Sequence, residues 1–236
     1  MNNTPPSSPS ILLLGASRGI GYAMAEDFVK RAWHVVGTVR AGARTRLHEL
    51  ASSHPDQVTI EIADTTRPEQ LVSLRDRLAH RRFDVLFVNA GTANRDPSAP
   101  IAQISTEEFI HVMVTNALGP MRAIETLGEL VTDAGLLGIM SSGQGSVANN
   151  EQGGRELYRA SKAALNMFMR SYAARHAGSA RAFLLLAPGW IRTELGGPDA
   201  PFTLEQTIPD IVNTLIDKLG RPGLEYLDRT GKTVPW

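Results

Sequence analysis

The chain has 236 residues, of which 42% are hydrophobic and 20% are charged, so it can form one domain with a substantial core but leaves little for a second. Its formal net charge is zero, and without a basic stripe the sequence gives no sign of a nucleic-acid partner. Cysteine is absent, which excludes disulfides, thiolate metal sites and a cysteine nucleophile, and the six scattered histidines form no metal-binding pair, so we expect no metal.

The first ten residues, MNNTPPSSPS, are polar and rich in proline and serine. They lack the basic start of a signal peptide, and the apolar run behind them is too short for one. No run in the sequence approaches the length of a membrane span. We therefore expect a flexible N-terminal tail over residues 1–9, a cytoplasmic location and no membrane partner.

Short apolar runs then alternate with helical patterns along the chain. We expect strands at 11–16, 34–39, 58–63, 83–90, 136–142 and 181–187, and helices at 20–31, 44–52, 68–80, 105–132 and 156–177. Several of these strands are continuous apolar runs, which is typical of parallel strands covered by helices on both faces. The repeated units predict an α/β fold, a single domain over residues 10–236 with a Rossmann-type doubly wound parallel sheet of about seven strands.

One stretch breaks this alternation. Residues 194–209, ELGGPDAPFTLEQTIP, are rich in glycine and proline. We expect a mobile loop here that shapes the substrate pocket.

A glycine-rich turn follows the first expected strand. The sequence LLLGASRGIG places Gly15, Gly19 and Gly21 after that strand and at the start of the next helix. Glycines allow a tight turn and a close backbone approach to a pyrophosphate, and the free N–H groups of the helix start attract an anion. The alternative is an ordinary strand-to-helix turn, but the position after the first strand favours a dinucleotide site.

The end of the second expected strand indicates which dinucleotide binds. An enzyme that uses NAD usually carries an acid near this point, whereas this chain has Val39 followed by Arg40, and Arg18 lies in the glycine-rich turn. Two guanidinium groups suit the 2′-phosphate of NADP(H), which they can hold by charge-assisted hydrogen bonds. The alternative is that both arginines are ordinary solvated surface residues.

These motifs, in this order, resemble the short-chain dehydrogenase/reductase family over about residues 10–236. Asp64 in IADTT sits where the family's acid contacts adenine, the NAG at 89–91 resembles the segment along the adenosine, and PGWIRT at 188–193 resembles the segment that closes over the nicotinamide. The expected cofactor contacts are Gly15, Ser17, Arg18, Gly19, Ile20, Gly21, Arg40, Asp64, Asn89, Ala90, Gly91, Tyr158, Lys162, Pro188, Gly189, Ile191 and Thr193.

A tyrosine and a lysine lie one helical turn apart in YRASK, which resembles the family's YxxxK signature. Residues four apart share a helix face, so Tyr158 and Lys162 point the same way. A nearby ammonium group favours the phenolate, which predicts a lowered pKa for Tyr158 and a better general acid or base near neutral pH. The resemblance also implies that Lys162 binds the nicotinamide ribose. The alternative is an exposed pair at a helix start.

Two further catalytic residues follow from the resemblance. Asn116 in VTNALGP matches the family's catalytic asparagine, expected to position a water that links Lys162 to solvent, although a helical asparagine can also simply bond its own backbone. The second serine of the SS pair, Ser142, matches the residue that holds the substrate oxygen, in competition with Ser141 and Ser146.

Two departures from the family pattern are visible. Val88 replaces the first asparagine of NNAG, and fifteen residues separate Ser142 from Tyr158, more than in many members. That long interval, YRASKAALNM and the ending GKTVPW are similar to a C-factor-like branch of small carbonyl reductases. The longer loop changes the shape of the site, so the substrate does not transfer from better-known members.

The expected function is an NADP(H)-dependent reduction of a small carbonyl compound, a ketone, aldehyde or 3-oxoacyl compound, or oxidation of the matching alcohol. The alternatives are a non-catalytic NADP-binding sensor on the same fold, and a lyase or dehalogenase that has lost its nucleotide. The helix at 156–177 carries apolar residues on more than one side: Ala163, Ala164, Leu165, Met167 and Phe168. One side can pack on the sheet, and the resemblance implies that another side meets the same helix of a second subunit, so we expect a homodimer, with a tetramer possible. The alternative is burial within one chain.

Overall fold

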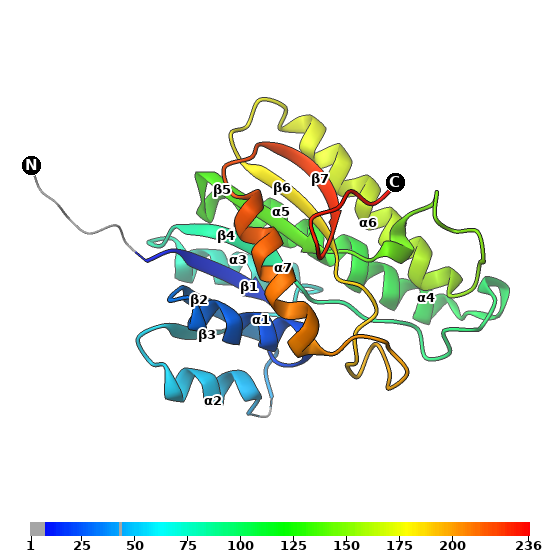
Figure 1. The fold of residues 1–236 in the computed structure, drawn as a ribbon, viewed down its shortest axis with the longest axis horizontal. Helices are drawn as coiled ribbons and strands as arrows, with labels where there is room; N and C mark the ends of the chain where they lie inside the picture. Colours follow the sequence, from blue (N-terminus) through cyan, green and yellow to red (C-terminus); the bar gives the residue numbers. More distant parts are fainter. Residues whose placement is uncertain (1–7, 43) are drawn as a thin grey trace, which may run out of the picture.

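The computed structural model describes residues 8–42 and 44–236 and contains one seven-stranded parallel sheet with the strand order β3-β2-β1-β4-β5-β6-β7 (Figure 1). The strands are β1 (Ser10–Leu14), β2 (His34–Val39), β3 (Val58–Ile62), β4 (Phe83–Val88), β5 (Val131–Met140), β6 (Ala182–Ala187) and β7 (Gly223–Asp228). The order reverses direction between β1 and β4, which pair in parallel. In doubly wound sheets this switch point opens a crevice at the carboxyl ends of the strands.

Helices cover both faces of the sheet, as the sequence predicts (Figure 1). They are α1 (Gly19–Lys30), α2 (Arg46–Ser53), α3 (Pro68–Leu78), α4 (Thr106–Met113), α5 (Gly119–Leu127), α6 (Glu156–Arg175) and α7 (Leu204–Lys218). Helices α1 and α7 pack together on one face, while α3, α5 and α6 lie on the other. Among the described residues, no helix combines the length and the apolar character needed to cross a membrane.

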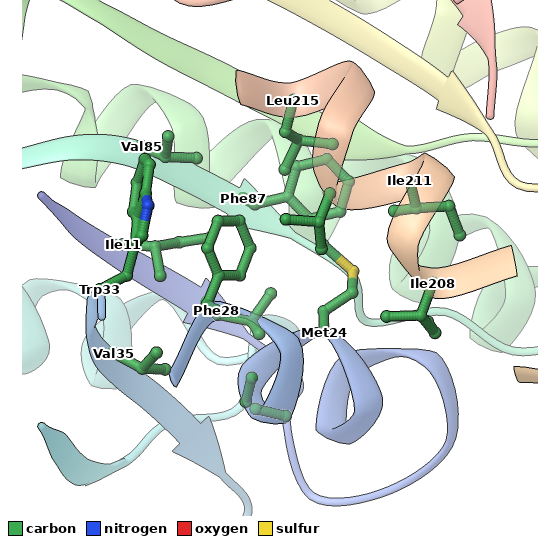
Figure 2. Packing of buried hydrophobic residues seen from close by; sticks show 14 of the residues in the cluster. Ile11, Met24, Phe28, Trp33, Val35, Val85, Phe87, Ile208, Ile211 and Leu215 are labelled. Carbon is green, nitrogen blue, oxygen red and sulfur yellow. The ribbon is translucent and has the colours of Figure 1, made fainter. Parts of the chain in front are cut away.

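The core consists of two apolar layers, one on each face of the sheet. Alternate residues of β1 face opposite layers: Ile11 packs with α1 and α7, whereas Leu12 packs with α3 and α5. Figure 2 shows the first layer, where the rings of Phe28 of α1 and Trp33 pack at a tilt with their centroids 4.9 Å apart. Burial on both faces explains why the strands read as continuous apolar runs.

The structure corrects the expected elements after β6. The predicted loop at 194–209 ends early, because α7 begins at Leu204 and contains Pro209. Thr203 caps this helix: its hydroxyl accepts a hydrogen bond from the Gln206 N–H at 3.3 Å, and the Gln206 side chain accepts one from the Thr203 N–H at 2.9 Å. The sequence predicts about seven strands but gives a position for only six of them, and the seventh strand is β7.

Two further expectations differ in detail. The helix expected at 105–132 is divided into α4, a single π-helical turn η2 (Val114–Leu118) and α5, and β5 already begins at Val131. The expected tail at 1–9 falls mainly on residues 1–7, which lie outside the described part of the chain.

Candidate active site

A cavity of about 1240 Å³ opens at the carboxyl ends of the strands. It is lined by the loops that follow β1 to β6, by α6 and by the segment after β6 that leads toward α7. All the predicted site residues line this cavity except Gly21 and Asn116. The structure therefore brings together residues from seven separate places in the sequence, at the edge where doubly wound sheets bind ligands.

The glycine-rich turn forms the floor of the cavity beneath α1. Gly15 has φ = +86°, a left-handed conformation that favours glycine, and its carbonyl accepts a hydrogen bond from the Asn89 amide at 2.9 Å. A Cβ atom on Gly21 would lie 2.1 Å from the Gly15 oxygen and 2.6 Å from Nδ2 of Asn89. Gly21 thus acts through packing, because it lets α1 start against the turn and face the cavity with its N-terminus.

Arginines gather at the end of the cavity beside this turn. Arg18 and Arg40 line it as predicted, and Arg67, which the sequence analysis did not select, lines it as well. Arg18 forms an ion pair with Glu194, and both side chains are exposed. This end of the cavity is therefore basic, and one of its arginines is held by a carboxylate of the loop after β6.

Asp64 lies at the same end and is locked in its ionised form. Its Oδ1 atom accepts hydrogen bonds from the Thr66 N–H at 2.9 Å and the Thr66 hydroxyl at 2.7 Å. Burial raises the pKa of this carboxyl group, but these hydrogen bonds and the charges of Arg40 and Arg67 outweigh burial, so the pKa is below its ordinary value. A fixed acceptor is what an adenine amino group or a ribose hydroxyl requires.

Tyr158 and Lys162 face the other end of the cavity from the start of α6. Nζ of Lys162 lies 5.9 Å from the centroid of the Tyr158 ring and donates a hydrogen bond to the Met140 carbonyl at 2.9 Å. Burial lowers the pKa of Lys162 from 10.5 to about 8. This lysine can therefore exchange a proton much closer to neutral pH than an exposed lysine can.

The expectation that the pKa of Tyr158 is lowered is wrong for the protein without a bound nucleotide. Burial raises the pKa of the phenol, and the Ser142 side chain and the charge of Arg155 offset this only in part. Nζ of Lys162 donates its hydrogen bond to the Met140 carbonyl rather than to the phenol. Tyr158 and Lys162 do share one face of α6, as predicted, but burial has a larger effect on the pKa of Tyr158 than the neighbouring charges have.

Asn116 is fully buried in the π-helical turn and does not line the cavity. Its Oδ1 atom accepts from the Thr92 N–H at 2.8 Å, and its Nδ2 atom donates to the Thr92 carbonyl at 2.8 Å and the Ser161 hydroxyl at 2.9 Å. The side chain therefore does not bond its own helix. It joins the loop after β4 to α6, next to the backbone of Gly91, whose missing Cβ would lie 3.5 Å from Oδ1 of Asn116 and 3.6 Å from Nζ of Lys162.

The three candidate serines have different surroundings. The Ser141 hydroxyl is buried and donates to Asn166 at 2.6 Å, and Ser146 lies outside the cavity with its hydroxyl near the Trp236 carbonyl. Ser142 lines the cavity, and its hydroxyl accepts only the Gln144 N–H at 3.1 Å among the hydrogen bonds of the described residues. Ser142 also lies beside the Tyr158 phenol, since its side chain offsets part of the rise that burial causes in the Tyr158 pKa, and this position favours Ser142 over the other two.

The sequence analysis missed part of the lining. Thr38 and Val39 end β2, and Ala63, Thr65 and Thr66 follow β3, so their positions in the expected sheet could have revealed them. Other lining residues come from loops or helices without a pattern that marks a site, and they are Thr92, Ile110, His111, Val114, Thr115, Met140, Gly143, Gln144, Arg155 and Trp190. Glu194, Leu195, Gly196 and Leu204 also line the cavity, and they fall in the stretch 194–209 that the sequence predicts to shape the pocket. Several of these surround Tyr158 and Ser142, where a substrate would bind.

Comparison with known proteins agrees with this geometry. The family model described as enoyl-(acyl carrier protein) reductase matches residues 15–208. The chain is 30% identical to C-signal of Myxococcus xanthus over 155 residues, which are 65% of this chain and 92% of that protein. It is 27% identical to a Rhodococcus protein named 1-hydroxy-2-glutathionyl-2-methyl-3-butene dehydrogenase, over 96% of this chain and 99% of that protein.

Two solved structures are also similar to this chain. A Burkholderia multivorans protein, described as a short-chain dehydrogenase/reductase with bound NADP, is 60% identical with a TM-score of 0.96, over 97% of this chain and 100% of that one. A carbonyl reductase from Pseudomonas aeruginosa in complex with NADP is 32% identical with a TM-score of 0.90, over 98% and 100% of the two chains. With the matched family model, these relations establish that the chain belongs to the short-chain dehydrogenase/reductase family.

Proposed function

We propose that this oxidoreductase transfers a hydride between NADP(H) and a carbonyl or alcohol substrate, with Tyr158 as the general acid and base. The observation that carries the proposal is the convergence of Ser142, Tyr158 and Lys162 on the cavity that the glycine-rich turn also lines. The substrate class is a ketone, an aldehyde or a 3-oxoacyl compound.

The residues of the cavity fit NADP(H). Gly15 and Gly19 line the cavity at the start of α1, where no side chain caps the helix, so its N-terminus can receive a pyrophosphate. Arg18 and Arg40 offer the paired guanidinium groups that a 2′-phosphate needs. The Burkholderia and Pseudomonas proteins both bind NADP. A cavity of about 1240 Å³ also leaves space for a small substrate beside the dinucleotide.

In this mechanism, bound NADPH supplies the hydride that the carbonyl carbon accepts. The Ser142 hydroxyl donates a hydrogen bond to the carbonyl oxygen and holds it beside Tyr158. The Tyr158 hydroxyl donates its proton to that oxygen as negative charge develops on it. Lys162, buried with a pKa of about 8, provides positive charge below the phenol and returns a proton to the site. Alcohol oxidation follows the same steps in reverse.

The test is NADPH consumption with a panel of ketones, aldehydes and 3-oxoacyl thioesters, with NADH in parallel. We expect turnover with NADPH that falls by at least about 10³-fold in Tyr158→Phe. Tyr172→Phe is the matched control, because Tyr172 is another buried tyrosine of α6 that does not line the cavity. An active Tyr158→Phe variant would exclude this role for the phenol.

The likeness to C-signal of Myxococcus xanthus favours a second candidate, a non-catalytic NADP-binding sensor. The two functions differ in one measurement. A sensor binds NADPH tightly and consumes none with any carbonyl compound, whereas the reductase consumes it. The set of Ser142, Tyr158 and Lys162 in one cavity favours the reductase, since a sensor needs no proton donor.

The proposed functional unit is a homodimer that pairs α4 and α6 with their copies. Met167 and Phe168 of α6 are 62% and 45% exposed, and Phe109 of the neighbouring α4 is 41% exposed. Large exposed apolar side chains on adjacent helices are typical of an interface. Light scattering after size-exclusion chromatography tests this: Met167→Glu should convert the dimer to a monomer, whereas a wild-type monomer would contradict the proposal.

A further inference from the structure

Arg155 has a strained backbone at the entry to α6. Its φ angle is +51°, and among the described non-glycine residues only Ala32 shares a positive φ. It follows Gly153 at +67° and Gly154 at +69°, so three successive residues adopt the left-handed conformation. A side chain in this region costs about 1–2 kcal/mol of conformational free energy. Such strain, when it lies beside a cavity, suggests that the side chain has a function there.

The backbone of this turn is held in place and aims the arginine at the site. Nε of Arg159 donates a hydrogen bond to the Gly154 carbonyl at 2.9 Å. The Arg155 side chain lines the cavity, and its guanidinium carbon lies 5.6 Å from the centroid of the Tyr158 ring. The long loop between Ser142 and Tyr158 therefore places the positively charged side chain of Arg155 next to Tyr158, the proposed proton donor.

This guanidinium group lacks an acceptor within the described part of the protein. Its Nε atom is buried without a hydrogen-bond partner, and no described carboxylate forms an ion pair with it. Leaving a charged donor buried and unpaired costs folding free energy. A ligand with an anionic oxygen would satisfy it, and a planar guanidinium matches a carboxylate or phosphate well.

Two more unpaired polar atoms line the same cavity. Oε1 of Gln144 and Oγ1 of Thr115 are buried without a partner, so three of the five such side-chain atoms in the described residues belong to this one cavity. Gln144 follows Ser142 by two residues, and its oxygen can accept a hydrogen bond from a ligand. The substrate end of the cavity is therefore equipped for a polar ligand.

The charges around this end also favour an anion. Arg155 and Lys162 line the cavity, whereas the two carboxylates of its lining, Asp64 and Glu194, are already engaged. Asp64 accepts from Thr66, and Glu194 is paired with Arg18. Nothing in the described lining would repel a carboxylate from the guanidinium group of Arg155.

We propose that Arg155 binds an anionic oxygen group, a carboxylate or a phosphate, that the substrate carries close to its carbonyl. The Thr115 hydroxyl can donate a hydrogen bond to this molecule, and the Gln144 oxygen can accept one from a hydroxyl group that it carries elsewhere. The apolar side chains of Ile110, Val114 and Trp190 receive the rest of the molecule. The preferred substrates are then oxo acids or oxo phosphates rather than neutral ketones. This inference rests on the proposed reductase function and narrows its substrate class.

The experiment compares matched pairs of carbonyl compounds in NADPH consumption: 2-oxo and 3-oxo acids with their methyl esters, and dihydroxyacetone phosphate with dihydroxyacetone. The anionic member should have a kcat/KM at least tenfold higher in the wild type. In Arg155→Asn, a residue that tolerates the left-handed backbone, this preference should fall at least tenfold, while Arg155→Lys retains part of it. Whether acids or phosphates show the larger ratio identifies the anionic group.

Arg77→Asn is the control, because Arg77 pairs with Glu61 outside the cavity and its loss should leave the ratio unchanged. Equal kcat/KM for anion and neutral partner in the wild type would overturn the inference, and so would a preference that survives in Arg155→Asn. Thermal unfolding establishes that each variant is folded.

A second measurement separates this inference from the proposed function. If no carbonyl compound is reduced, the reductase proposal fails, and calorimetric titration of 3-hydroxybutyrate and inorganic phosphate into the NADP-saturated protein then tests the subsite alone. Binding that weakens at least tenfold in Arg155→Asn supports the anion subsite. Equal binding to both proteins, or binding to neither, overturns it.

Discussion

The ammonium group of Lys162 lies 5.9 Å from the ring centroid of Tyr158, and the hydrogen bond of its Nζ atom goes to the Met140 carbonyl instead. Lys162 is thus held by the end of β5 beneath the phenol, and burial affects both side chains more than they affect each other. Burial makes a charge costly in each case, since it raises the pKa of the tyrosine and lowers that of the lysine.

This burial makes stability depend on pH in a defined window. The pKa of Lys162 is about 8 in the folded protein, against 10.5 as its ordinary value, so between these values the unfolded chain holds a proton that the folded chain has released. The free energy of unfolding therefore rises with pH across this window. Relative to Lys162→Met, the wild type should gain about 2 kcal/mol between pH 8 and pH 9.5.

Urea unfolding of both proteins without nucleotide, at several pH values, measures this gain. Subtracting the Lys162→Met curve removes the titration of other groups, including the tyrosines. A difference that does not change with pH would show that the lysine is not desolvated as its burial indicates.

The arginines beside the glycine-rich turn should determine the choice of coenzyme. Arg18→Ala and Arg40→Ala each remove one charge-assisted hydrogen bond to a 2′-phosphate, so kcat/KM with NADPH should fall about 10- to 100-fold while that with NADH changes little. Steady-state kinetics with both coenzymes measures the ratio. A parallel loss with NADH would contradict a role at the 2′-phosphate.

The ion pair between Arg18 and Glu194 predicts that removing the charge of Glu194 strengthens NADPH binding, whereas removing Arg18 weakens it. A 2′-phosphate must compete with Glu194 for Arg18, and an exposed pair of this kind is worth about 0–1 kcal/mol. Glu194→Gln should therefore tighten NADPH binding by up to about fivefold in fluorescence titrations. Weaker binding in this variant would mean that Glu194 assists the coenzyme rather than competing with it.

Asn116 should contribute to stability in proportion to its three hydrogen bonds. Asn116→Ala leaves both main-chain groups of Thr92 without their partner, so the free energy of unfolding should fall by about 2–3 kcal/mol. Ser161→Ala removes one of these three bonds together with the bond that the Ser161 hydroxyl donates to the Tyr158 carbonyl, and it should cost about 1–2 kcal/mol. Urea unfolding of the two variants compares them, and equal effects would contradict the bridging role of Asn116.

Gly21 should tolerate no side chain. In Gly21→Ala the new Cβ would lie 2.1 Å from the Gly15 oxygen, so α1 must move away from the turn, and NADPH affinity should fall at least about tenfold. Gly220→Ala is the comparison, since Gly220 has φ = +68° and open space around it, and it should cost only about 1 kcal/mol of stability from backbone strain. Fluorescence titration and thermal unfolding separate the two effects.

The fold was predictable where local pattern and tertiary burial agree. Strands such as β1 and β6 are continuous apolar runs because helices cover both of their faces. The start of α7 was missed because glycine and proline dominate the preceding stretch, although the capping box from Thr203 to Gln206 was a readable signal. The edge strand β7 was not located because its residues GLEYLD are only partly buried.

The cofactor half of the site was predictable for a similar reason. The glycine-rich turn and the pair of Tyr158 and Lys162 are short local motifs, and the sheet topology brings them together. The substrate half depends on how the loop between Ser142 and Tyr158 folds back over the cavity. Arg155 and Gln144 carry no local pattern that marks this return, and the raised pKa of Tyr158 depends on burial that the sequence does not specify.

The left-handed backbone at Arg155 also has a consequence for laboratory evolution. Glycine at position 155 would relieve the conformational strain and raise stability by about 1 kcal/mol, while removing the only side chain that carries positive charge in this turn. Selection for heat resistance alone would therefore favour glycine there and erode discrimination between anionic and neutral substrates. An arginine at position 155 would be kept only under selection for the choice of substrate, because it lowers the stability of the protein while it favours anionic substrates.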